Sequence, residues 1–119
     1  MKVVDILQSV KDARGSIAKK EILSAHRDNS NLRKALLYGL DNFTPFNVVK
    51  VPKVKSRLEF PLSEDAAWEE FFRVADECAS RKVTGNAAID SIYTCFSSVC
   101  KEEESWTRKI LNKHLAIGA

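Results

Sequence analysis

The amino-acid sequence predicts an all-α fold, a compact bundle of about six helices with one long basic loop between the third and fourth helices. Apolar residues recur at spacings of three and four in six separate segments. The residues between these segments include the glycine, asparagine, serine and threonine that commonly begin and end helices. All three prolines fall within residues 41–62, where the helical pattern breaks.

Length and composition predict one domain. The chain has 119 residues, of which 45% are hydrophobic and 29% charged, as is ordinary for a soluble globular protein with its own core. No apolar run approaches the roughly 18 residues needed to cross a bilayer. Asp5 interrupts the N-terminus too early for a secretory signal. We expect a cytoplasmic monomer with no membrane association.

The first third of the sequence predicts three short helices. Gly15 would end the first and Ser16 would cap the second, and a cap at Asp28-Asn29-Ser30 would begin the third. Loops this short favour antiparallel or orthogonal packing. The helical segments are residues 2–11, residues 17–27 with Ile17, Ile22 and Leu23 on the apolar side, and residues 32–40.

Residues 41–62 predict an extended loop that is rich in positive charge. The part around residues 46–51 has the pattern of extended chain and allows a short strand pair. Lys50, Lys53, Lys55 and Arg57 follow without an acidic residue before Glu59. Such a segment is either a solvated basic loop or one that follows a phosphate backbone without recognising its sequence.

The second half predicts three longer helices. The first begins after Ser63 and carries Trp68, Phe71, Phe72 and Ala75 on one side, the heaviest apolar stripe in the chain. We expect this stripe to be the core rather than a surface on which bases stack. The second helix reaches about residue 100, and the third covers roughly residues 102–116, with acidic residues at its start and basic ones towards its end.

The turn at residues 81–90 has the composition of an anion site. Thr84 or Asn86 can accept from the first free amides of the following helix, and Gly85 can adopt backbone angles that other residues resist. The positive end of that helix would then lie beside Arg81 and Lys82. The alternative is a capped turn between two core helices with a solvated basic pair.

Charge is distributed unevenly along the chain. Residues 1–57 hold 12 Lys/Arg and 5 Asp/Glu, a net charge of +7, whereas residues 58–119 hold 7 and 11, a net of −4. The whole chain therefore carries only +3. The asymmetry favours one surface suited to a polyanion, although a mixed solvated surface is also consistent with it.

The cysteines do not predict a disulfide framework or a metal site. Three cysteines at irregular spacing agree with a reducing compartment. Cys78, Cys95, Cys100 and His114 could be offered as zinc ligands, but they lack the close Cys-x-x-Cys pairing of structural zinc sites. We therefore expect no metal and no cofactor in this chain.

Residues 81–90, Arg-Lys-Val-Thr-Gly-Asn-Ala-Ala-Ile-Asp, resemble a segment in the N-terminal domain of tailed-phage ATP-dependent DNA ligases. Three weaker stretches resemble the same family in the same order, so that the resemblance spans nearly the whole chain. They are Asp28-Asn29 with Leu32, Lys50-Val51-Pro52-Lys53, and Ile117-Gly118-Ala119.

The resemblance implies that residues 1–119 are an all-helical DNA-binding domain at the N-terminus of a longer ligase. The parent enzyme would seal nicks during replication, repair and recombination with ATP and magnesium, in the cytoplasm of the infected host. The partner of this domain would be nicked double-stranded DNA. One phosphate clamp would be Arg81, Lys82, Thr84, Gly85 and Asn86, a second would include Gly118, and Lys50, Lys53 and Lys55 would supply charge along the strand.

The sequence predicts no catalysis by this chain itself. The family's AMP-accepting lysine lies in a Lys-x-Asp-Gly motif, and no such tetrapeptide occurs here. The alternative function is a non-catalytic helical adaptor of a phage replication complex, whose acidic half would bind a protein partner. A small cysteine or zinc enzyme is a third alternative, for which the sequence offers no credible site.

Overall fold

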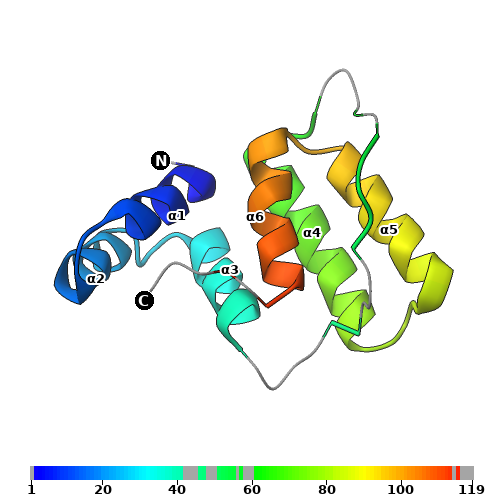
Figure 1. Ribbon diagram of the computed structural model, residues 1–119, viewed down its shortest axis with the longest axis horizontal. Helices are drawn as coiled ribbons and strands as arrows, with labels where there is room; N and C mark the ends of the chain where they lie inside the picture. The colour runs from blue at the N-terminus through cyan, green and yellow to red at the C-terminus, as the bar shows by residue number, and fades with distance from the viewer. Residues whose placement is uncertain are drawn as a thin grey trace.

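Six α-helices form the regular secondary structure of the described residues, which confirms the predicted all-α fold (Figure 1). The computed structural model describes residues 2–41, 46–47, 51–55, 57, 61–113 and 115. None of the described helices is both long and apolar enough to span a membrane. The helices are α1 (Val3–Asp12), α2 (Ser16–Ala25), α3 (Ser30–Leu40), α4 (Glu64–Ala79), α5 (Gly85–Ser97) and α6 (Lys101–Leu111).

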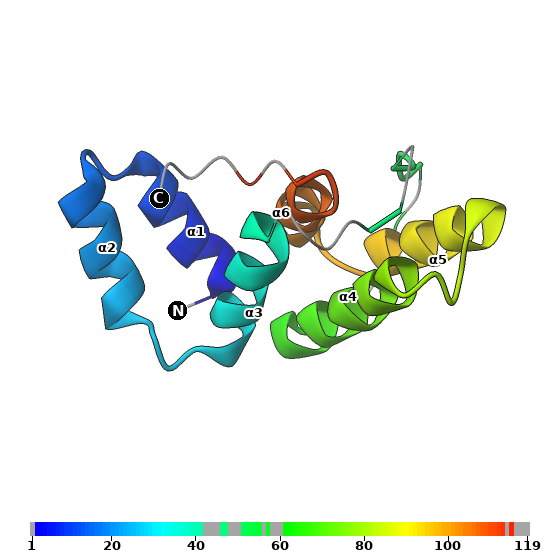
Figure 2. The same cartoon turned by 90° about the horizontal axis from the view of Figure 1, so that it is seen from below.

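Helix α4 provides the centre of the core, with α5 and α6 packed against it (Figures 1 and 2). Ser63 caps its N-terminus, because the Ser63 hydroxyl accepts from the N–H of Ala66 at 3.4 Å. Trp68, Phe71 and Phe72 are buried, with exposed fractions of 0%, 1% and 5%. The aromatic stripe is therefore core, as predicted, and is not available for stacking on bases.

Helices α1 and α3 form the other half of the core. Five apolar residues of α1 are buried, and α3 packs against α1, α4 and α6, so that it joins the two halves (Figure 2). Asn29 caps α3 as predicted, since its side-chain oxygen accepts from the N–H of Leu32 at 3.1 Å. Gly39 lies on the buried side of α3, where a Cβ would come within 3.0 Å of the Leu115 side chain.

Helix α2 lies at the periphery and packs mainly against α1 (Figure 1). It contributes no buried residue, although Ile22 and Leu23 pack partly against the core. The predicted apolar side is wrong at Ile17, which is 74% exposed. The physical reason is that α2 has one main helical neighbour, which covers only part of an apolar stripe.

Several predicted helix ends are wrong in detail. Gly15, with a φ of 85°, is the cap residue before α2, and Ser16 is the first residue of that helix. The C-cap of α1 is Ala13 rather than Gly15. The predicted fifth and sixth helices also end early, at Ser97 and Leu111.

The early end of α6 has a structural cause at Lys113. This residue has a φ of 54°, which interrupts the helical path, and its ammonium donates to the carbonyls of Tyr38 and Asp41 at 2.5 and 2.6 Å. Lys113 thereby caps the C-terminus of α3 across 72–75 positions of sequence. The predicted role of Gly118 falls outside the described residues.

The segment between α3 and α4 is described at residues 46–47, 51–55, 57 and 61–63, and these residues form no strand. The predicted strand pair would also involve residues that lie outside the described set. Phe46 is the inner anchor of this segment: it is 5% exposed and packs beside the ring of Tyr38, with the Lys113 ammonium 4.4 Å from its ring centre.

Candidate nucleic-acid interface

The turn between α4 and α5 begins with an arginine in the left-handed conformation. Arg81 has a φ of 62°. Its N–H donates to the Cys78 carbonyl at 3.2 Å, and the N–H of Lys82 donates to the Glu77 carbonyl at 2.9 Å. This is the hydrogen-bond pattern of a Schellman motif, in which the left-handed residue is usually glycine. An arginine there is strained, and such strain is commonly retained at functional sites.

The start of α5 leaves its amides open. Thr84 occupies the N-cap position, but its side chain makes no capping hydrogen bond, and Asn86 lies within the first turn. The predicted capping by Thr84 or Asn86 is therefore wrong, because the N-cap residue is Thr84 and its side chain makes no such bond. Within the described part of the chain, the N–H groups of Gly85, Asn86 and Ala87 have no hydrogen-bond partner. Gly85 has a φ of 58°, which agrees with the predicted need for glycine.

The end of α4, in contrast, is fully hydrogen-bonded. Its last four carbonyls all accept from donors in the turn or from Asn47. The donors are the N–H groups of Ser80 (to Asp76, 3.0 Å), Lys82 (to Glu77, 2.9 Å) and Arg81 (to Cys78, 3.2 Å), and the side-chain amide of Asn47 (to Cys78, 3.1 Å, and Ala79, 3.2 Å). The turn therefore combines an occupied negative helix end with an open positive one, which favours an anion.

The side chains at this turn are available to a ligand. Arg81, Lys82, Thr84 and Asn86 are all exposed. None of the ion pairs formed by the described residues includes Arg81 or Lys82. The first turn of α5 contains no acidic residue. The five predicted clamp residues thus lie within residues 81–86 and are all exposed, and their contacts with DNA stay a prediction.

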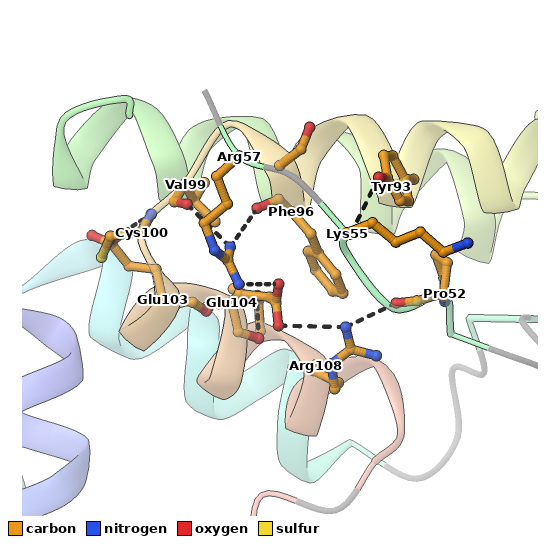
Figure 3. A network of polar contacts seen from close by, with 12 residues as sticks. Pro52, Lys55, Arg57, Tyr93, Phe96, Val99, Cys100, Glu103, Glu104 and Arg108 are labelled. Carbon is orange, nitrogen blue, oxygen red and sulfur yellow. Dashed lines mark hydrogen bonds and ion pairs between the residues drawn. The ribbon is translucent and has the colours of Figure 1, made fainter. Parts of the chain in front are cut away.

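The basic segment, whose described residues are 46–47, 51–55 and 57, is hydrogen-bonded to the helical part of the protein (Figure 3). The Arg57 guanidinium donates to the Phe96 and Val99 carbonyls at 3.1 and 3.4 Å, and it pairs with Glu104 at 2.7 Å. Arg108, which also pairs with Glu104 at 3.4 Å, donates to the Pro52 carbonyl at 2.8 Å. Arg57 is therefore a structural anchor rather than one of the free cations of the predicted loop.

Two of the three predicted loop lysines are described, and both are exposed. The N–H of Lys55 lies 3.3 Å from the Tyr93 hydroxyl of α5, while its ammonium points away from the network in Figure 3. Lys53 is also exposed. The segment thus lies along the helix whose first turn forms the candidate anion site. Lys50 falls outside the described residues, as does Gly118.

Sequence reasoning missed the residues that hold these parts in place. Asn47 contacts residues 31 and 32 positions away, Arg57 pairs with Glu104 across 47 positions, and Arg108 donates to Pro52 across 56. Asn47 has a φ of 59°, a conformation that asparagine tolerates better than most residues. The residue type is therefore the one local signal for this contact that the sequence contains. The contacts of Arg57 carry no such signal, because their partners meet only in the folded chain.

Two of the three cysteines have thiols whose pKa is strongly raised. Burial raises the pKa of the Cys95 thiol to about 12 and that of Cys100 to about 11, so both remain neutral at physiological pH. The described residues contain no group of three or more His, Cys, Asp or Glu side chains arranged to hold a metal ion. His114, offered above as a zinc ligand, lies outside them.

Comparison with known proteins yields structural relatives only. No protein-family model matches the sequence, and no curated protein matches it. The solved structure named Pmar-Lig_PreS3 matches the whole chain with a TM-score of 0.83 and 26% identity. The structure named Pmar-Lig_Pre also matches the whole chain, with a TM-score of 0.80 and 27% identity.

The chain spans about a quarter of the solved structures that it matches, 27% in each case. Their names designate ligases. The chain is therefore similar, over its full length, to a ligase-associated domain.

Proposed function

We propose that this chain binds nicked duplex DNA without sequence preference, as the N-terminal domain of an ATP-dependent DNA ligase. The observation that carries the proposal is the open N-terminus of α5, flanked by Arg81 and Lys82, which are exposed and form no ion pair with another described residue. The likeness of this whole chain to about a quarter of each ligase structure supports assigning the anion site to DNA rather than to a small anion.

The geometry suits one backbone phosphate. The amides of Gly85, Asn86 and Ala87 can donate to its oxygens, while Arg81 offers a planar guanidinium and Lys82 a mobile ammonium. Groups that contact a backbone phosphate in this way do not reach the edges of the bases. Contacts of this kind position a protein on the duplex and carry no sequence information.

The basic segment would extend the contact along the same strand. Gly85 and Tyr93 are eight positions apart on α5, which corresponds to about 12 Å along the helix axis. One DNA strand advances about 3.4 Å per nucleotide, so this length spans three to four nucleotides. Lys53 and Lys55 would meet phosphates at that distance from the turn, and Lys50 remains a predicted contributor.

In the parent enzyme this domain would hold the substrate while other residues transfer AMP. ATP and magnesium would be cofactors of that chemistry, which requires the Lys-x-Asp-Gly motif that this chain does not contain. The contribution of the present residues is to bind the DNA and to fix its position, which lowers the entropic cost of the reaction. The parent is proposed to act in the infected host, as a phage enzyme.

Fluorescence anisotropy with a labelled duplex carrying one nick tests the proposal. The wild-type chain should bind, and log affinity should fall linearly with log salt with a slope of about −0.9 per phosphate contacted. Arg81→Ala/Lys82→Ala should weaken binding to all sequences alike and make the slope shallower by about 1 for each lost contact. Alanine leaves the left-handed strain at position 81 unchanged, so the fold should persist.

A control variant of equal charge separates the site from general electrostatics. Lys2→Ala/Lys101→Ala removes two exposed cations at the N-terminal ends of α1 and α6. It should change affinity much less than the variant at the turn. An equal loss in both variants, a slope near zero, or absence of binding at low salt would refute the proposed site.

A further inference from the structure

Asn47 joins two parts of the candidate interface that are distant in sequence. Its side-chain amide donates to the carbonyls of Cys78 and Ala79 at 3.1 and 3.2 Å, the last two carbonyls of α4. The preceding residue, Phe46, is buried between Tyr38 and the Lys113 ammonium. The beginning of the basic segment is therefore fixed to the residues immediately before the turn.

The amide of Asn47 changes the electrostatics of the turn. The unsatisfied carbonyls at the C-terminus of a helix carry about half a negative charge, which repels anions. Arg81 follows Ala79 by two positions, so these carbonyls lie at the start of the turn to which the proposed function assigns a phosphate. The backbone N–H groups of the turn reach three of the last four carbonyls, and among the described residues only Asn47 donates to Ala79.

Asn47 also holds a conformation that few residues accept. With a φ of 59° it lies in the left-handed region, where asparagine, aspartate and glycine are best tolerated. A backbone bent in this way brings the short side chain onto the end of α4. The conformation thus serves the contact with Cys78 and Ala79, and the contact in turn maintains the conformation.

We propose that Asn47 is a positioning residue for the anion site: it occupies the negative end of α4 and fixes the basic segment beside the turn, so that an incoming phosphate meets only donors. The inference rests on the proposed function. It predicts that DNA affinity depends on a residue that need not touch DNA.

Two variants at position 47 test this inference by anisotropy with the nicked duplex. Asn47→Gly keeps the left-handed backbone but removes the amide, and it should weaken binding about two- to fivefold, the size of one helix-end charge interaction. Asn47→Asp keeps size and conformation but replaces the donor with a carboxylate, and it should weaken binding further. Unchanged affinity in both variants would overturn the inference.

The matched control is Asn29→Ala, which removes the side-chain cap of α3 far from the turn in sequence. It should lower stability as the loss of a cap does, yet leave affinity unchanged when binding is measured well below the melting temperature. An equal loss of affinity in this control would show that the effect of Asn47 is general destabilisation.

A double-mutant cycle locates the effect. In the Arg81→Ala/Lys82→Ala background, Asn47→Gly should cause a much smaller loss than in the wild type, because both changes act on the same phosphate contact. A full additional loss would place the action of Asn47 elsewhere and overturn the inference. If the wild type itself does not bind, the proposed function fails; if only the Asn47 variants behave as wild type, the inference alone fails.

Discussion

Arg81 and Gly85 both have φ values in the left-handed region, at 62° and 58°, but only one of them is glycine. At Gly85 a Cβ would meet no atom within 4 Å, so glycine is required there by its backbone angle alone. The same angle at Arg81 would be better served by glycine as well. The proposed function gives a reason for an arginine here, because its guanidinium would contact the phosphate.

We predict opposite effects of Arg81→Gly on stability and on binding. An L-residue in the left-handed region costs about 1–2 kcal/mol, part of which is offset by the greater freedom of glycine in the unfolded chain. The free energy of unfolding should therefore rise by about 0.5–1 kcal/mol, as measured by urea denaturation. DNA affinity should nevertheless fall, with a shallower salt slope. A less stable variant, or one with full affinity, would contradict this assignment.

The sequence predicted the composition of the turn but not its local geometry. The basic pair and Gly85 follow from residue type, and they lie where expected. The side-chain cap by Thr84 or Asn86 does not form, and the left-handed conformation falls on Arg81 as well as on glycine. Helix propensities describe average preferences, whereas these details depend on which neighbours, such as Asn47, arrive from distant parts of the chain.

At the scale of elements, the basic segment is held by side chains of α5 and α6 rather than by its own secondary structure. Glu104 is central, because it pairs with both Arg57 and Arg108 and its side chain is largely buried. The segment was predicted as an extended basic loop, and its described residues agree. Sequence reasoning counted Arg57 as a free cation because a one-dimensional pattern cannot show a partner 47 positions away.

Glu104→Gln should loosen this segment without unfolding the protein. Glutamine keeps one acceptor but loses the charge that holds two guanidinium groups, so unfolding should become easier by about 1 kcal/mol. Trypsin should then cleave faster after Lys53 and Lys55, as followed by mass spectrometry. Glu102→Gln, at an exposed acid of the same helix, is the control. Equal cleavage rates for both variants would mean that the network does not restrain the segment.

At the scale of the whole molecule, the core is unevenly shared among the helices. Helix α4 contributes seven buried residues, whereas α2 contributes none. Sequence periodicity predicted six helices and the central aromatic stripe correctly, because burial of a stripe determines which residues can occupy it. It could not predict the peripheral position of α2, since an amphipathic pattern does not reveal how many neighbours will cover it.

Hydrogen exchange should reveal this difference. Amides in α2 should exchange at least tenfold faster than those in α4, which corresponds to opening at about 1.4 kcal/mol or more below the global free energy. Mass spectrometry of peptic peptides covering the two helices provides the measurement. Equal protection of α2 and α4 would contradict the prediction, because it would mean that the peripheral helix unfolds only with the whole domain.

The contact between Lys113 and the end of α3 has a consequence for synthesis of the protein. Helix α3 is synthesised well before Lys113, which follows Asp41 by 72 positions. At a translation rate of about 5–20 residues per second, the last carbonyls of α3 lack the Lys113 ammonium for roughly 4–14 s. During this interval Gly39 also lacks its neighbour Leu115. The N-terminal half therefore completes its packing only after Lys113 and Leu115 have been synthesised.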